Sequence, residues 1–247
     1  MNPEPISPEL LGEFRKLSTC VVASAIETFD VRLRNTGFAN SSVRSMFPDF
    51  PPLVGYAATA RIRTADPPME GHSYYARPDW WQYIRTIPEP RVIVIQDTDS
   101  HPGLGAFVGE VHANILLALG CAGLVTNGAV RDLPAVHASG FQMFAGNVSV
   151  SHGYAHVFDF GGSVELGGLK IDPGDLIQGD LHGVQTMPGE IATRVASVAH
   201  DILLKRKALI ELCHSKDFTV AKLNETLRSM ESNSTKLPHN ETPNIFE

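Results

Sequence analysis

The sequence predicts an α/β domain in which part of the sheet is parallel. Two apolar runs of strand length, residues 91–97 and 122–128, flank a helix-like run at 107–119. A second helix and a third strand-like run follow, at 132–140 and 142–150. Because a helix between two buried strands returns the chain to the same end of a sheet, this repeated alternation favours parallel pairing.

The N-terminal part of the chain predicts two short helices and one strand. Ser7, which precedes a proline and an acid, is a good N-cap, and Ser18 can cap a second helix. Residues 31–52 contain several breakers, so we expect irregular structure there. Residues 54–64 alternate enough between apolar and polar side chains to predict a strand.

Residues 66–83 hold an unusual number of aromatic side chains between prolines. These aromatic residues are Tyr74, Tyr75, Trp80, Trp81 and Tyr83. They could cover an exposed edge of the core, or they could form a lid or pocket wall, because long loops rich in aromatic side chains often bind ligands. The sequence leaves both interpretations open.

The C-terminal half changes character. Residues 163–188 contain Gly-Gly, Pro-Gly and Asp-x-x-Gly signals between short β-branched runs, so they predict antiparallel hairpins, with residues 179–183 as a turn. Residues 191–215 predict one long amphipathic helix. We therefore expect a single domain over residues 1–215 and a polar, disordered or loosely packed tail over residues 216–247.

The composition is that of a globular protein that binds neither nucleic acid nor membrane. Of the 247 residues, 43% are hydrophobic and 19% are charged, which supplies enough apolar material for a core. The net charge of −7 argues against a nucleic-acid surface, because phosphate binding needs clustered Lys and Arg. The basic cluster at residues 205–207 is expected to be a solvated helix face. No apolar run approaches the roughly 18 residues that a membrane span needs.

The N-terminus and the cysteines favour a cytoplasmic location. The first residues lack the basic and apolar regions of a signal peptide. Cys20, Cys121 and Cys213 are odd in number and far apart, so they indicate neither a disulfide framework nor a metal site. We expect each of them to be a small buried hydrophobic residue.

Gly109 and Glu110 fall at the start of the predicted helix 107–119. Backbone N–H groups in a first turn have no partner within the helix, and the helix dipole favours an anion there. Since Gly109 carries no side chain, a ligand carboxylate could reach the amides of Val111 and His112. The alternative is that Glu110 only complements the dipole, as acids in a first turn commonly do.

Arg131 and Asp132 follow the predicted strand 122–128 and open the next helix. Asp132 is a good helix N-cap, and Arg131 could pair with any nearby surface acid. The alternative is a ligand site, because α/β proteins bind ligands at the carboxyl ends of their strands. Arg131 suits a carboxylate, and Asp132 suits Mg²⁺ or Mn²⁺ as a hard oxygen ligand. With Glu110, the pair could hold a metal ion and a 2-oxo acid.

Other familiar sequence patterns give weaker evidence for a catalytic or ligand-binding site. His152 and His156 are four residues apart, but their segment is a poor helix, so we expect structural or pocket-lining histidines. Ser24 and Ser151 lack the context of a nucleophilic serine. The sequence contains no Walker or GxGxxG phosphate loop.

Two segments carry a family resemblance. They are GEVHANILLALGCAGLVTNGAVRD (109–132) and GGLKIDPGDLIQGDLHGVQTMP (167–188). Both resemble the family that joins 4-hydroxy-4-methyl-2-oxoglutarate aldolases with the regulator of ribonuclease activity A, and the resemblance covers roughly residues 17–210. It implies an α/β/β/α sandwich related to swivelling phosphohistidine domains. It also implies a homotrimer or homohexamer with sites between subunits.

The same resemblance implies a class II pyruvate aldolase, a lyase that uses Mg²⁺ or Mn²⁺. By position, Asp132 resembles the direct metal ligand, and Glu110 the acid that holds metal-bound water. Arg131 resembles the clamp for the pyruvyl group, with the amides of Val111 and His112 on its carboxylate. The implied reaction is C–C cleavage of a 4-hydroxy-2-oxo acid with release of pyruvate, accompanied by decarboxylation of oxaloacetate.

The sequence departs from the family pattern in three places. Asn127 stands where the family often has Asp, and Ser24 lies near a position that is often Asp. Members of the family also use an acid from the C-terminal helix of a neighbouring subunit. Lys207 or Glu211 stands near that position in this sequence, and of the two only Glu211 is an acid. Two alternative functions follow: a metal-dependent decarboxylase or hydrolase of a bulkier 2-oxo acid, and a non-catalytic protein that regulates a ribonuclease.

Overall fold

An eight-stranded sheet forms the centre of the protein in the computed structural model, which describes residues 5–68 and 77–232. Its strands are β1 (Arg44–Ser45), β2 (Leu53–Arg63), β3 (Arg91–Asp97), β5 (Cys121–Thr126), β7 (Gln142–Ala145), β9 (His156–Phe160), β12 (Leu176–Asp180) and β13 (Gly183–Met187). They lie in the order β1-β7-β5-β3-β2-β12-β13, and β9 also pairs with β2. Strands β3, β5 and β7 are mutually parallel, as the sequence predicts, and β2 pairs parallel with β3 as well.

The sheet nearly closes on itself. Phe38 bridges Gln185 of β13, and the amide of Ala39 donates to the carbonyl of Val184 at 2.9 Å. A few residues later, β1 pairs with β7 at the opposite edge of the sheet. The segment that the sequence predicts to be irregular, residues 31–52, therefore connects the two edges of the sheet.

Alternation along the strands divides the apolar residues between two cores. On β3, Val92 and Val94 face the inside of the nearly closed sheet, whereas Ile93 and Ile95 face the helices outside. Each fully buried side chain of this kind contributes roughly 1.5–3 kcal/mol. Because both faces of β3 are covered, it has the continuous apolar sequence of a central parallel strand.

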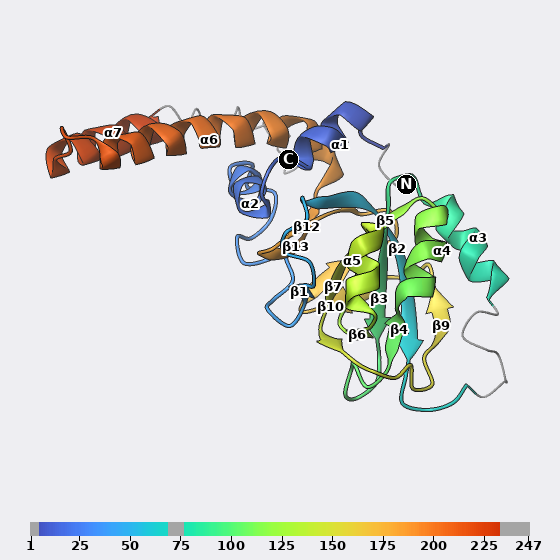
Figure 1. Ribbon diagram of the computed structural model, residues 1–247. Helices are drawn as coiled ribbons and strands as arrows, with labels where there is room; N and C mark the ends of the chain where they lie inside the picture. Colours follow the sequence, from blue (N-terminus) through green and yellow to red (C-terminus); the bar gives the residue numbers. More distant parts are fainter. Residues whose placement is uncertain (1–4, 69–76, 233–247) are drawn as a thin grey trace, which may run out of the picture.

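The helices are α1 (Pro8–Phe14), α2 (Thr19–Glu27), α3 (Pro78–Thr86), α4 (Glu110–Ala118), α5 (Leu133–Ser139), the short 3-10 helix η1 (Gly189–Ile191), α6 (Ala192–His214) and α7 (Val220–Ser232). Helices α3, α4 and α5 lie along the outer face of the sheet, whereas α6 and α7 project away from it (Figure 1). The two predicted N-caps are confirmed, because Ser7 accepts from the amide of Leu10 and Ser18 from that of Val21. Together these elements make one mixed α/β domain with a long C-terminal helix.

A second, smaller sheet lies beyond the ends of β3, β5 and β7. It consists of β4 (Ala106–Val108), β6 (Ala129–Val130) and β8 (Asn147–Val148), all parallel. Two predictions are wrong here. The helix predicted from 107 begins at Glu110, because the preceding residues form β4. The strand predicted over 142–150 is divided at Gly146, where a Cβ would lie 2.3 Å from the carbonyl oxygen of Asn127.

The predicted hairpins are confirmed. Strand β10 (Val164–Leu166) pairs antiparallel with β11 (Leu169–Ile171), and β12 pairs antiparallel with β13. The turn between β12 and β13 is tied to the N-terminal helices by Asp180. Its carboxylate accepts from the amide and hydroxyl of Thr19, at 2.9 and 2.6 Å, and from the amide of His182.

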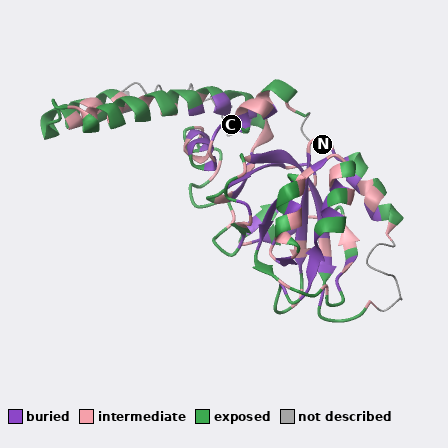
Figure 2. Ribbon diagram, viewed as in Figure 1, coloured by how far each residue is buried: buried purple, intermediate pink, exposed green. Residues whose placement is uncertain are grey.

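The long C-terminal helix is confirmed as α6, which extends well beyond the domain (Figure 1). Part of the tail predicted to be disordered or loosely packed, residues 220–232, forms the helix α7, which folds back along α6, where Lys205 donates to the carbonyl of Met230. Residues 233–247 of the tail lie outside the described residues. Between residues 200 and 230 no residue is buried (Figure 2). We call the helical hairpin 200–232 the arm.

Cys121 is buried as expected, but Cys20 and Cys213 are exposed, so that prediction is wrong for two of the three cysteines. Over residues 5–68 and 77–232, no helix combines the length and apolarity needed to cross a membrane.

Candidate functional site

Parallel pairing between β4 and β6 brings the predicted site residues together. Val108 lies opposite Val130, and the amide of Arg131 donates to the carbonyl of Val108 at 3.0 Å. Gly109 and Glu110 follow β4, whereas Arg131 and Asp132 follow β6. The two segments therefore leave the small sheet side by side and each opens a helix, α4 and α5. The predicted proximity of Glu110, Arg131 and Asp132 is confirmed.

The carboxylate of Asp132 lies at the N-terminus of α4. Asp132 occupies the N-cap position of α5, but it has left-handed backbone angles (φ 56°, ψ 36°) and its side chain makes no capping bond to α5. Its Oδ2 instead accepts from the amide of Glu110 at 3.2 Å, and both of its oxygens lie 3.3 Å from Nε of Arg131. The interpretation of Asp132 as a simple N-cap of α5 is therefore wrong, because its carboxylate accepts from the first amide of the neighbouring helix α4.

Gly109 makes this approach possible. A Cβ at position 109 would lie 2.4 Å from Oδ2 of Asp132 and 2.8 Å from Cγ of Arg131. The backbone at Gly109 is extended (φ −134°, ψ −161°), which any residue can adopt. Glycine is thus needed here for space rather than for its backbone angles.

The site faces solvent. The side chains of Asp132 and Arg131 are 36% and 31% exposed, and Glu110 is exposed at the first position of α4. Val111 is also exposed, whereas His112 is buried. The amides of the first turn and three charged side chains therefore share one accessible surface.

His112 supports this surface from below. Its Nδ1 lies 3.0 Å from the carbonyl oxygen of Phe107, and since a carbonyl can only accept, Nδ1 carries the proton. Burial lowers the pKa of His112 to about 4, which outweighs the opposing effect of the Phe107 bond, so the ring is neutral near pH 7. The ring also packs against Phe107 and Trp81, with centroid distances of 4.7 and 5.5 Å.

Asp97 and Asn127 hold the loop that leads into β4, and Asp97 is not among the residues that the sequence predicts to be functional. The side chain of Asn127 accepts from the amide of Asp97 at 2.7 Å and donates to its carbonyl at 2.9 Å. Asp97 is buried, and its Oδ2 accepts from the amide of Gly103. Burial raises the pKa of its carboxyl group. The sequence feature that could have pointed to Asp97 is its place as an acid at the end of the apolar run 91–97.

The two histidines of residues 151–160 have structural roles. His152 donates from Nδ1 to the carbonyl of Ala106, and His156 donates to that of Tyr154. The described residues contain no group of three or more His, Cys, Asp or Glu side chains that could hold a metal ion. A metal ion at Asp132 and Glu110 would therefore need further ligands from water, substrate or another chain.

The aromatic residues that are described in this segment lie on helix α3. Trp80 is buried in the outer core, stacked on Tyr83 at 5.7 Å, so for this residue the core-covering interpretation is confirmed. Trp81 lies against His112. Tyr74 and Tyr75 lie outside the described residues, and the lid hypothesis stays a prediction.

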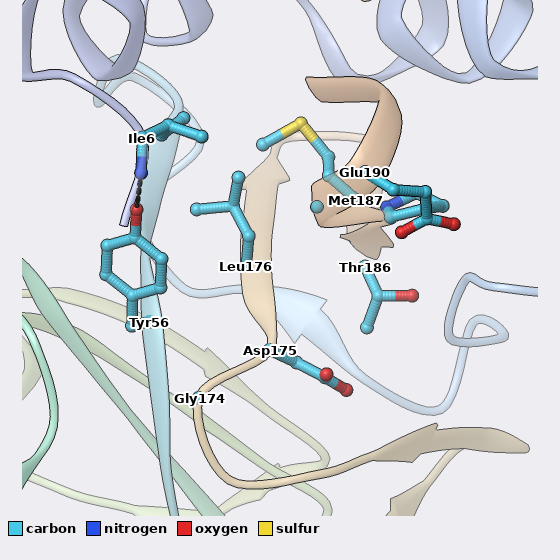
Figure 3. A pocket seen from close by; sticks show the side chains of 10 residues that line it. Ile6, Tyr56, Gly174, Asp175, Leu176, Thr186, Met187 and Glu190 are labelled. Atoms are coloured by element: carbon cyan, nitrogen blue, oxygen red, sulfur yellow. Dashed lines mark hydrogen bonds between the residues drawn. The ribbon is translucent and has the colours of Figure 1, made fainter. Parts of the chain in front are cut away.

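A cavity of about 260 Å³ lies apart from these residues, at the amino end of β2 (Figure 3). Tyr56, Leu176 and Met187 form its floor as in-register neighbours on β2, β12 and β13. The hydroxyl of Tyr56 accepts from the amide of Ile6 at 2.8 Å, and Glu190 of η1 lines the other side. None of the predicted site residues lines this cavity.

Comparisons with known proteins match most of the domain. Residues 19–185 match the family profile described as RraA-like, Aldolase/RraA. A protein of Halalkalibacterium halodurans, named "Putative 4-hydroxy-4-methyl-2-oxoglutarate aldolase", is 34% identical over 84 residues. That match covers 34% of this chain and 40% of the relative, so this chain spans less than half of the relative's length.

Solved structures share the fold. An uncharacterized protein from Pseudomonas syringae pv. tomato superposes with a TM-score of 0.70 at 22% identity, covering 93% of this chain and 97% of that one. Streptomyces coelicolor RraAS2, described as an unusual member of the RNase ES inhibitor RraA protein family, superposes with a TM-score of 0.63 at 19% identity. The second match covers 82% of this chain and 97% of RraAS2. At these identities the likeness concerns the fold alone.

Proposed function

This chain belongs to the RraA-like family of aldolase and RraA proteins, and from that premise we propose that it is a divalent-metal-dependent lyase. Its proposed substrate is a 4-hydroxy-2-oxo acid, which it cleaves between C3 and C4 to release pyruvate. One observation carries the proposal. The carboxylate of Asp132 and the guanidinium of Arg131 meet at the amide end of α4, beside Glu110.

The donor set suits a hard divalent cation. Asp132 and Glu110 offer only carboxylate oxygens, and Mg²⁺ or Mn²⁺ prefers such ligands while keeping several water molecules. Two carboxylates on an exposed surface leave room for a chelating 2-oxo acid. When bound, the cation would polarise the 2-oxo group and stabilise negative charge on its oxygen.

The residues of this chain then have distinct roles. The amides of Val111 and His112, near the positive end of the α4 dipole, would bind the substrate carboxylate. Arg131 would stabilise the charge that develops on the 2-oxo oxygen as the C3–C4 bond breaks and its electron pair moves toward that oxygen. In this step the C4 hydroxyl would give its proton to a water molecule held by Glu110, and C3 would take a proton back from that water afterwards. The same charge develops when oxaloacetate loses CO₂, so we propose that reaction as a side activity.

Assembly belongs to the proposal as well. The arm presents Leu203, Leu204 and Ile210 to solvent, and exposed apolar groups of this kind commonly mark contacts between chains. A homotrimer or homohexamer would cover them. Glu211 of the arm is exposed and is the residue proposed to reach the site of a neighbouring subunit.

A screen of 2-oxo acids for pyruvate release tests the function. Purified protein with Mg²⁺ or Mn²⁺ should release pyruvate from oxaloacetate or a 4-hydroxy-2-oxo acid, and EDTA should stop the release. Asp132→Ala should abolish turnover without unfolding the protein, because Asp132 is more than a third exposed. Asp217→Ala on the exposed link between α6 and α7 is the control and should keep the wild-type rate.

Two outcomes would contradict the lyase proposal. No pyruvate from any 2-oxo acid with either metal ion would remove it. Full activity of Asp132→Ala would show that the site has been misassigned. Inactive protein that slows a purified ribonuclease in a parallel assay would support the regulatory alternative instead.

A further inference from the structure

His112 is buried directly beneath the surface that the lyase proposal uses. It is 1% exposed and stands at the third position of α4, next to the amides expected to bind the substrate carboxylate. In the proposed reaction only the backbone amide of His112 binds the substrate. Its side chain is polar and is buried, like those of Ala113 and Leu116 on the same helix.

The side chain joins the helix to the strand before it. Nδ1 of His112 donates to the carbonyl of Phe107, which lies on β4 just before the turn at Gly109. The bond closes a loop of backbone from residue 107 to residue 112. This loop contains the first-turn amides of α4, so its closure limits how far they can rotate away from Asp132.

The ring itself is held in place on two sides. Phe107 packs at 4.7 Å and an angle of 42°, and Trp81 packs at 5.5 Å and an angle of 60°. Trp81 belongs to α3, whose neighbouring Trp80 is fully buried. The aromatic helix therefore braces the imidazole from a rigid part of the core.

We propose that His112 is a positioning residue, which holds the first turn of α4 in the orientation that binds a 2-oxo acid carboxylate. This inference rests on the proposed lyase function, which it extends to a residue away from the reacting atoms. The carboxylate is bound both in the substrate and in the transition state. Loss of the Nδ1 bond should therefore weaken binding and raise KM, with a smaller effect on kcat.

Three substitutions separate this role from simple packing. His112→Phe keeps the ring but removes the donor, so KM for oxaloacetate should rise about tenfold, the cost of one misplaced hydrogen bond, with kcat within about threefold. His112→Asn places an amide near the position of Nδ1 and should return KM to within about threefold of wild type. His112→Gln reaches the position of Nε2 and should not.

Thermal unfolding separates an effect on substrate binding from an effect on stability, because the order of the variants in Tm should differ from their order in KM. His112→Asn leaves a cavity and should have a lower Tm than His112→Phe, yet bind substrate better. If KM instead follows Tm across the three variants, His112 is only a packing residue and the inference falls. The control is His137→Phe, because His137 is a half-exposed histidine of α5 that contacts Asp49 outside the site.

Oxalate binding distinguishes a failure of this inference from a failure of the lyase proposal. Oxalate resembles the planar product of C–C cleavage, and its Kd can be measured by calorimetry with Mg²⁺ even if no substrate turns over. The Kd should rise about tenfold in His112→Phe and recover in His112→Asn. Equal affinity in all variants would contradict the inference alone. Wild-type protein that neither binds oxalate nor releases pyruvate would contradict both proposals.

Discussion

At the residue scale, the left-handed backbone of Asp132 determines the geometry of the candidate site. Asp is among the few non-glycine residues that tolerate this conformation. The conformation turns the carboxylate away from its own helix and toward the amide of Glu110. The sequence predicted which residues would meet, but the capping bond within α5, which was one of the two interpretations of Asp132, is not formed.

Gly109→Ala should disturb the site more than the fold. The added methyl group would overlap Oδ2 of Asp132, a side chain that can move into solvent, so we expect a stability loss of about 1–3 kcal/mol. Because the carboxylate moves, pyruvate release should fall at least about tenfold. Gly12→Ala is the matched control, since nothing lies within 4 Å of a Cβ there. Wild-type kinetics in Gly109→Ala would mean that Asp132 need not lie over α4.

At the element scale, the β12–β13 hairpin is fastened to the N-terminal helices by buried polar side chains. Asp180 binds Thr19 at the start of α2, and Gln178 donates to the carbonyls of Phe14 and Leu17. Gln185 donates to the carbonyl of Thr19. The sequence predicted the turn around Asp180 but not its partners, because these contacts join residues more than 160 positions apart.

Asp180→Ala should therefore destabilise the protein by about 3 kcal/mol at neutral pH, since it leaves buried donors without an acceptor. Burial alone would raise the pKa of Asp180, but the bonds from Thr19 and His182 lower it below the usual 3.8. Because the pKa is lower in the folded state, the ionised carboxylate stabilises the fold at any pH above the pKa of the unfolded state. This stabilisation is lost as the pH falls through the pKa of the folded state.

Urea unfolding of wild type and Asp180→Ala at several pH values measures this effect. The difference in unfolding free energy should be constant above about pH 5 and shrink below about pH 4. Asp201→Ala, at an exposed position of α6, should show no such difference. A difference that persists unchanged at low pH would argue that the carboxylate charge is irrelevant.

At the scale of the whole molecule, the arm contributes little to the folded core but offers a surface on which a second chain can assemble. None of its described side chains up to residue 230 is buried, so the domain does not depend on them for its core (Figure 2). Leu203 and Ile210 are seven residues apart and therefore lie on one face of α6. This face is available to a second copy of the chain.

The double substitution Leu203→Asp with Ile210→Asp tests that use. Both side chains are exposed, so unfolding of the single chain should change by about 0.5 kcal/mol or less. Sedimentation velocity should show a smaller assembly than wild type, because two charges would face the apolar contact. Ser197→Asp, at an exposed position on the same helix, is the control. An unchanged sedimentation coefficient would place the contact elsewhere.

The sequence by itself determined the elements whose signals are local. The apolar runs of β3 and β5, the serine caps of α1 and α2, the hairpins and the length of α6 all follow from patterns within a few neighbouring residues. The candidate residues Glu110, Arg131 and Asp132 were found in the same way, by residue type and by their positions at predicted element ends.

Only the tertiary structure decided how those residues meet. Strands β4, β6 and β8 have two or three residues each, too few for any periodic signal, and they exist because β3, β5 and β7 deliver them side by side. The burial of His112, the direction of the Asp132 carboxylate and the return of α7 along α6 likewise depend on distant neighbours. Such contacts join residues that are far apart in the sequence and form only when the fold packs them together, so no local sequence pattern predicts them.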